Sequence, residues 1–198
     1  MLAQLTTVKA RLGISEADVT QDALLTRAIE AVSARFDREC RRTLARTENF
    51  SQEFDAEDCE IIASCYPVER VAKFESKTSE AAGWTEIQPA PDYVVRRACV
   101  ISLAAPPGGE QLDGLGPQFR VTYTGGYVLP GTTAEQSQNA LPADLAQAAV
   151  EQVAYWYQNR DRLGVIREWP KGGIYEQFVD LDLLPAVRAV LEHYRRWG

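Results

Sequence analysis

The sequence has little of what catalytic and metal sites are commonly built from. Of its 198 residues one is a histidine, His193, and the four cysteines, Cys40, Cys59, Cys65 and Cys99, form no C-x-x-C pair. A zinc site needs closer ligand spacing. A Ser-His-Asp or Cys-His arrangement would depend on the single histidine. We therefore expect no catalytic residues, no metal and no cofactor, and we interpret the cysteines as small buried side chains in a reducing compartment.

The sequence also shows no phosphate-binding loop and no membrane-spanning segment. Three glycine pairs occur, at 108–109, 125–126 and 172–173, but none has the spacing or the following Lys and Ser/Thr of a phosphate loop. We interpret them as turns or mobile loops. No apolar run approaches the roughly 20 residues of a membrane span. The N-terminus lacks the charged-then-apolar order of a signal peptide.

The charge balance is acidic. The net charge is −7 and the pI about 4.9, which argues against general nucleic-acid affinity because phosphate contacts need clustered Lys and Arg. An acidic wall would still let DNA slide past without sequence-specific binding. Hydrophobic residues make up 45%, as in ordinary globular proteins, and the length suffices for one domain with a real core.

Apolar spacing predicts four helices. The first spans about 2–12 and stops at Gly13, and the second runs from 20 or 22 to 42. The best-marked one is the central helix, 141–163, which is Ala-rich and carries Pro142 where a first turn tolerates it. Its predicted face is Ala146, Val150, Val153 and Tyr157, widened by Ala149 and Trp156. A terminal helix is expected over about 185–197.

Between the second and third helices the pattern has period two. Residues 44–127 are rich in β-forming residues, and short linkers predict antiparallel strands. The fold class expected is α+β, a helical frame with an inserted antiparallel β region. We expect one domain, 1–198, with these parts: N-terminal helices 1–43, β-rich insertion 44–127, linker 128–140, central helix 141–163, and loop with C-terminal helix 164–198.

Two charged patches lie close in sequence. The basic patch is Arg35, Arg38, Arg41, Arg42 and Arg46, and the acidic patch is Glu53, Asp55, Glu57, Asp58 and Glu60. Cations near the C-terminus of a helix complement its dipole, which accounts for two or three of the arginines; the remaining arginines can pair with an acidic surface of a neighbouring chain. The default interpretation of the acidic patch is a solvated hairpin tip.

The terminal helix is the third candidate surface. Val187, Val190, Leu191 and Tyr194 form an apolar stripe at helical spacing. The stripe can pack on the central helix or dock on another chain, and aromatic and arginine residues favour docking. The full candidate docking set is Val187, Arg188, Val190, Leu191, Tyr194, Arg195, Arg196 and Trp197.

The order of these pieces resembles the head–tail connector (adaptor) proteins of tailed bacteriophages, the ring-forming phage gp6-like family. The similar stretches are residues 6–14 (TTVKARLGI), 22–25 (DALL), 40–44 (CRRTL), 67–71 (PVERV), 120–127 (RVTYTGGY), 141–160 (LPADL to YQNR) and 184–196 (LPAV to YRR). Each stretch is short, and their shared order along nearly the whole chain carries the resemblance.

The resemblance implies a non-enzymatic ring, typically of twelve copies, made in the host bacterial cytoplasm and located in the virion neck. The ring would sit under the portal protein, extend the DNA channel and bind the next neck or tail protein. In this family the C-terminal segment commonly contacts the portal, so the candidate docking set becomes portal-binding. Heterologous ring contacts need two complementary surfaces on each copy, a role that the basic and acidic patches fit.

Two alternatives stay open. Another neck or tail protein, a stopper or a tail terminator, would have a mostly β fold without the helical frame. A small carboxylate-dependent hydrolase would have a pocket with two close carboxyl groups, although no spacing in the sequence singles out a pair.

Overall fold

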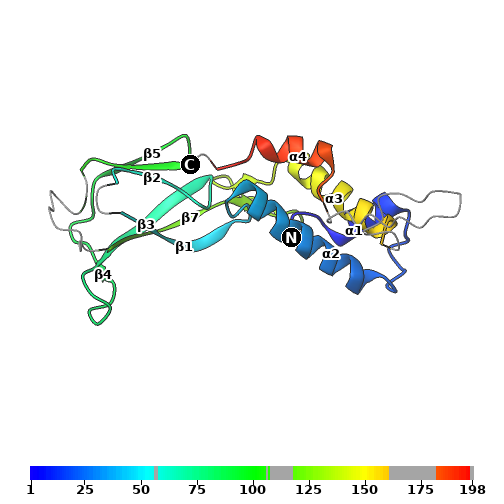
Figure 1. Ribbon diagram of the computed structural model, residues 1–198, viewed down its shortest axis with the longest axis horizontal. Coiled ribbons are helices and arrows are strands. Elements are labelled where there is room, and N and C mark those ends of the chain that lie inside the picture. Colours follow the sequence, from blue (N-terminus) through cyan, green and yellow to red (C-terminus); the bar gives the residue numbers. More distant parts are fainter. Residues whose placement is uncertain (56–57, 106, 108–117, 161–181, 197–198) are drawn as a thin grey trace, which may run out of the picture. The chain divides into compact units, whose positions relative to one another are not determined.

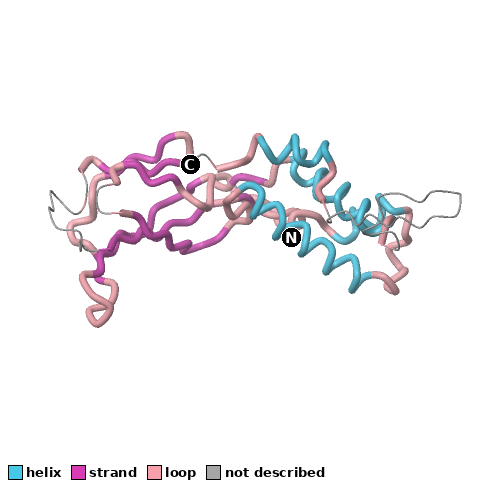
Figure 2. Tube along the Cα trace, in the orientation of Figure 1, coloured by secondary structure: helices cyan, strands magenta, loops and turns pink. Residues whose placement is uncertain are grey.

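A computed structural model describes residues 1–55, 58–105, 107, 118–160 and 182–196. The chain divides into two compact units. We call residues 1–40, 129–131 and 141–195 the helical unit, and residues 41–128, 132–140 and 196–198 the β unit. Figure 2 shows helices in the first and strands in the second. The α+β class with helices and an antiparallel region is confirmed.

The helical unit contains α1 (Leu5–Leu12), α2 (Asp22–Cys40), α3 (Ala143–Gln158) and α4 (Pro185–Glu192). As predicted, α1 stops at Gly13, whose φ of 70° is left-handed. The Gly13 amide donates to the Ala10 carbonyl and the next amide to the Lys9 carbonyl, which satisfies the last carbonyls of the helix. The terminal helix is shorter than expected, because α4 ends at Glu192 instead of continuing to 197.

Helix α3 is the centre of the helical unit. It packs against α1, α2 and α4, and Figure 1 shows it alongside α4. Its buried face is broader than the predicted stripe: Val150 and Val153 are buried, but Ala146 and Tyr157 are only half-buried, and Leu145 is fully buried instead. Of the two residues predicted to widen the face, Ala149 is buried and Trp156 is half-buried. A helix with neighbours on three sides buries more than one stripe of side chains.

The β unit contains two antiparallel sheets and a short parallel pair. The four-stranded sheet has the order β1 (Thr47–Phe54), β7 (Gln118–Gly125), β3 (Val68–Lys77), β4 (Thr85–Glu86). The three-stranded sheet has the order β2 (Glu60–Ile62), β6 (Val100–Leu103), β5 (Tyr93–Arg96). The parallel pair, β8 (Tyr127–Val128) with β9 (Asn139–Ala140), joins the two ends of the segment expected to be a linker.

The core of the β unit is formed by side chains from both sheets. Its buried members are Ile61, Ala63, Cys65, Val68, Phe74, Ile101, Leu103, Val121 and Tyr123. Along β7, Phe119, Val121 and Tyr123 lie on one face and Arg120, Thr122 and Thr124 on the other. Thr122 and Thr124 are buried as well, so this end of the strand is covered on both faces. Of the cysteines, Cys40 and Cys65 are buried while Cys59 and Cys99 are half-buried, and none of the four forms a disulfide.

The glycine pair at 125–126 forms a turn that only glycine fits. A Cβ on Gly125 would lie 2.5 Å from the Cys65 carbonyl oxygen, and one on Gly126, which has a φ of 96°, 2.6 Å from the Ala45 carbonyl oxygen. The close approach brings together the chain entering β1 and the chain entering β3. The predicted turn is therefore confirmed at this pair, and its cause is backbone contact. The pairs at 108–109 and 172–173 lie outside the described residues.

Candidate interaction surfaces

The apolar stripe of α4 faces the inside of the helical unit. Val187 and Leu191 are 3% and 2% exposed, and α4 packs on α3 and α2. Val190 is half-buried and Arg188 exposed. Of the candidate docking set, the two innermost apolar side chains thus stabilise the fold of the free chain, and Val190 and Arg188 remain reachable by a partner.

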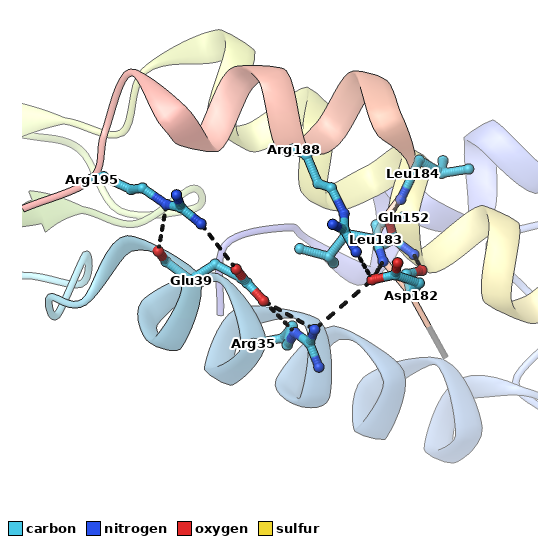
Figure 3. A network of polar contacts seen from close by, with 8 residues as sticks. All are labelled: Arg35, Glu39, Gln152, Asp182, Leu183, Leu184, Arg188 and Arg195. Atoms are coloured by element: carbon cyan, nitrogen blue, oxygen red, sulfur yellow. Dashed lines mark hydrogen bonds and ion pairs between the residues drawn. The ribbon is translucent and has the colours of Figure 1, made fainter. Parts of the chain in front are cut away.

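A polar network fixes both ends of α4 (Figure 3). Before the helix, Asp182 pairs with Arg188 and lies 4.0 Å from Arg35 of α2. Arg35 in turn pairs with Glu39 at 3.0 Å. After the helix, Arg195 donates to the Glu39 carbonyl at 3.2 Å and approaches its carboxylate at 3.5 Å. The hydrogen bond from Arg188, followed by one from a backbone amide, lowers the pKa of Asp182.

Gln152 is the buried part of this arrangement. It lies on α3 with 0% exposure. Its side-chain oxygen accepts a hydrogen bond from the Leu184 amide at 2.9 Å, and its side-chain nitrogen donates to the Asp182 carbonyl at 3.4 Å. Gln152 therefore holds the two residues that lead into α4. Sequence reasoning missed this residue; the available signal was a glutamine among the apolar residues of the central helix.

Tyr194 also binds within the helical unit. Its hydroxyl lies 2.8 and 2.9 Å from the two carboxylate oxygens of Asp144, in the first turn of α3. Tyr194 and Arg195 are both engaged by their own chain. Trp197, the last member of the candidate docking set, lies outside the described residues.

The five arginines of the predicted basic patch have different environments. Arg35 and Arg38 belong to the helical unit, and Arg41, Arg42 and Arg46 to the β unit. Arg35 is half-buried in the network above, whereas Arg38 and Arg41 are exposed. These two side chains, with no ion pair among the described residues, are the part of the patch that a partner can reach.

Arg42 is a structural residue. It is 4% exposed, its guanidinium carbon lies 3.3 Å from the centre of the Tyr66 ring, and it donates a hydrogen bond to the Tyr66 carbonyl. The same guanidinium carbon lies 5.3 Å from the centre of the Tyr127 ring. A planar guanidinium can stack on aromatic faces and is attracted by them, which stabilises its charge in this buried place. Arg42 is consequently not available at the surface of the free chain.

Arg46 is also paired internally. It binds Glu69 at 2.9 Å and Glu48 at 2.8 Å. These hydrogen bonds, the one from Glu69 foremost, raise the pKa of Arg46. Arg46 is 22% exposed at its side chain, and its charge is largely compensated by the two carboxylates.

The acidic patch lines a groove of the β unit. Glu53, Asp55, Asp58 and Glu60 are exposed, and Glu57 lies outside the described residues. With Gln52, Phe54, Ile61, Ile62, Gln118 and Arg196 they line a cavity of about 470 Å³. We call this cavity the acidic groove. It is bordered by β1 and β2, which are edge strands of their respective sheets.

Arg196 lies in the acidic groove and joins a buried hydrogen-bond network. Its Nη2 donates to the Ile62 carbonyl at 2.7 Å, which also accepts the Gln52 side-chain amide at 2.9 Å. Gln52 accepts the Tyr123 hydroxyl at 2.9 Å, and that hydroxyl accepts the Ser64 amide at 2.9 Å. Burial raises the pKa of Tyr123 to about 12.

The acidic groove is suited to recognition of a cation. Its four carboxylates are exposed, so they lack the apolar surroundings that hold a proton on a catalytic acid. Within the described ranges no group of three His, Cys, Asp or Glu residues could hold a metal, and His193 is exposed at the end of α4. No helix of the described part is long and apolar enough to cross a membrane.

Comparison with known proteins supports the resemblance found in the sequence. Residues 2–95 match the family described as Phage gp6-like head-tail connector protein. These residues include α1, α2 and the strands through β4, together with most of β5. No curated protein matches the chain.

Solved structures match over almost the whole chain. One match is a chain in the "Neck of empty GTA particle computed with C6 symmetry", with a TM-score of 0.61 at 18% identity, covering 98% of this chain and 89% of that chain. Another is in the "Virion of native gene transfer agent (GTA) particle", with a TM-score of 0.56, 18% identity and the same coverage. At this identity the likeness shows a shared fold that extends beyond the family match to α3 and α4.

Proposed function

Because residues 2–95 match the family described as Phage gp6-like head-tail connector protein, we propose that the protein is a structural connector of the virion neck. In this proposal copies of the chain form a ring under the portal, extend the DNA channel and bind the next neck or tail protein. The role is non-enzymatic, and DNA passes through the ring without sequence-specific contacts.

The observation that carries the proposal is that family match and fold similarity agree. The family match ends at residue 95, but the similar fold in the neck structure covers 98% of the chain. The helical unit, with four helices among the described residues, is the frame that a mostly β stopper or tail terminator would lack. The connector is therefore favoured over these alternatives.

The ring is the natural oligomer for this role. The neck structure that matches the chain was computed with C6 symmetry, and copies around a rotation axis meet through heterologous contacts that close. We expect twelve copies, as the resemblance implies. The exposed Arg38 and Arg41 and the acidic groove are the charged surfaces proposed for contacts between copies.

The portal contact is assigned to the outer side of α4 and the end that follows it. Val190 and Arg188 are the described candidates on the helix, with Arg195, Arg196 and Trp197 after it. Arg188 is exposed although it pairs with Asp182, and an exposed ion pair contributes little to stability. Such a pair can be exchanged for a partner's carboxylate at little cost.

Capsid heads purified from a phage that lacks this protein test the proposal. The purified chain should bind these heads as a ring visible at the portal vertex by electron microscopy and should restore tail joining. The variant Arg188→Glu should bind heads less tightly, and Arg27→Glu, the same change at an exposed position of α2, should bind as the wild type does. Absence of wild-type binding to heads would refute the connector role.

A further inference from the structure

Strand β5 leaves one edge of the three-stranded sheet open (Figure 1). Among the described strands it pairs with β6 alone, and β2 forms the opposite edge of this sheet. The Asp92 carbonyl accepts the Ala104 amide at 2.9 Å. Because hydrogen-bonded pairs alternate along antiparallel strands, Asp92 and every second residue after it direct their backbone groups to β6. The amides and carbonyls of Tyr93 and Val95 therefore point to the open edge.

The open edge also exposes apolar side chains. Val94 is 62% exposed on the outer face of the sheet, and Tyr93 is 40% exposed although its ring contacts Phe74, with 5.6 Å between the ring centres. A cavity of about 170 Å³ lies beside the strand, and Val94 of β5 and Ser102 of β6 are among its lining residues. The Ser102 hydroxyl is buried and has no hydrogen-bond partner in the described part of the chain. An edge with free backbone groups and exposed apolar side chains is a template for pairing with another strand.

The sequence of this edge, residues 92–96 (DYVVR), is complementary to itself in the reverse direction. An antiparallel second copy centred on Val94 places Asp92 opposite Arg96 at both ends of the contact. It also places Tyr93 opposite Val95, and these are the residues whose backbone groups point to the open edge, so amide-to-carbonyl bonds can form between the copies. Parallel pairing in register would instead set like charges opposite each other at both ends, which is destabilising. The charges therefore select the antiparallel arrangement.

Both end charges are available for this contact. Asp92 is exposed and forms no ion pair within the described ranges. Arg96 pairs with Glu60 at 2.9 Å, but both side chains are 61% exposed, and an exposed ion pair contributes little to stability. A guanidinium has five donors, so Arg96 can bind Asp92 of a second copy and keep its contact with Glu60.

We propose that the free chain forms a twofold dimer in which β5 of one copy pairs antiparallel with β5 of a second copy, so that their two three-stranded sheets become continuous. The contact is isologous, because both copies use the same surface. Neighbours around the axis of a ring meet through heterologous surfaces, so this dimer belongs to the free chain and not to the ring. It goes beyond the proposed function and does not depend on it. Dimerisation covers an edge that is otherwise open to aggregation before assembly.

Sedimentation equilibrium of the purified full-length chain, without heads, tests the dimer. The wild type should show a reversible monomer–dimer equilibrium with a Kd of about 10–100 µM, the weak range expected of a small interface. Val94→Lys sets like charges opposite each other at the centre of the contact and should raise this Kd by about tenfold or more. Val19→Lys is the matched control, because Val19 is 69% exposed and belongs to the helical unit. The control should associate as the wild type does.

Two charge variants test the pairing of the strand ends. Asp92→Arg and Arg96→Asp each set like charges opposite each other at both ends of the contact, so each variant alone should raise the Kd by about tenfold or more. In an equimolar mixture the arginines of one variant meet the aspartates of the other, and the mixture should dimerise as the wild type does. Circular dichroism of each variant controls for folding. Failure of the mixture to dimerise while both variants are folded would refute the proposed pairing.

Three results separate the dimer from other uses of the edge. A wild-type chain that stays monomeric at concentrations well above the expected Kd, or unchanged association of Val94→Lys, would overturn the inference. Val94→Lys should bind heads as the wild type does, because the ring does not use this contact. Loss of head binding by a variant that still dimerises would assign the edge to a neck partner and would also overturn the inference. Failure of the wild-type chain to bind heads contradicts the proposed function and leaves the dimer standing.

Discussion

Replacing Gln152 by methionine should weaken the helical unit through two lost hydrogen bonds. Methionine has similar length and no strong polar group, so the packing of α3 changes little. The Leu184 amide and the Asp182 carbonyl, now bound at 2.9 and 3.4 Å, would lose their partner at a site where Gln152 is 0% exposed. An unsatisfied buried group costs about 1–3 kcal/mol, and the longer of the two bonds contributes the smaller part. We therefore expect a loss of about 1–3 kcal/mol in the free energy of unfolding.

Urea unfolding followed by far-ultraviolet circular dichroism measures this loss. Hydrogen exchange at the Leu184 amide gives a local readout and should become faster in the variant. Gln147→Met is the matched control, because Gln147 lies on the same helix but is exposed and binds Glu151 at its surface. The control should change the unfolding free energy by no more than about 0.5 kcal/mol. Equal effects of the two substitutions, or unchanged exchange at Leu184, would show that Gln152 does not hold the segment leading into α4.

Three further outcomes are expected. Tyr123→Phe should lower the stability of the β unit by about 1–3 kcal/mol in urea unfolding, because two backbone amides and a glutamine lose the buried hydroxyl; a change below about 0.5 kcal/mol would contradict this. Gly125→Ala should abolish soluble folded protein, since its Cβ would meet backbone at 2.5 Å, whereas Gly83→Ala, with a φ of 67° and open space around it, should cost only about 1–2 kcal/mol. Arg188 lowers the pKa of Asp182 in the folded state, so the stabilising contribution of the Asp182 carboxylate is present above the ordinary carboxyl pKa of 3.8 and is lost as the pH falls through the folded pKa. The difference in unfolding free energy between the wild type and Asp182→Asn, measured at a series of pH values, should therefore shrink below pH 3.8. A difference that does not depend on pH would refute the pairing.

Local patterns determined much of the fold. The stop of α1 at Gly13 follows from the freedom of glycine to adopt a positive φ. The buried face of α2, Leu25, Ile29, Val32 and Phe36, follows from helical spacing. The antiparallel β region followed from linkers too short for helical crossovers. These features are set by neighbours within a few residues, so the sequence by itself contains them, and it also contained the scattered stretches that resemble the connector family.

Tertiary structure decided which charged residues remain at the surface. Five arginines form one basic patch in the sequence, yet Arg42 is stacked on Tyr66 and Arg46 is paired with Glu69. The partner residues lie more than 20 positions away, and no local period reports such pairing. The sequence therefore gives the number of arginines in the patch but not which of them are exposed. A guanidinium is buried where the fold places aromatic rings, carbonyls or carboxylates around it.

The same reason explains the residues that the sequence did not reveal. Gln152 looks like a polar interruption of an apolar helix until the fold brings the Leu184 amide to it. Arg196 looks like one of several terminal cations until the edge strands β1 and β2 place carboxylates and the Ile62 carbonyl around it. Periodicity determines which face of an element is buried. The identity of the groups that meet there depends on long-range packing, which only the folded chain specifies.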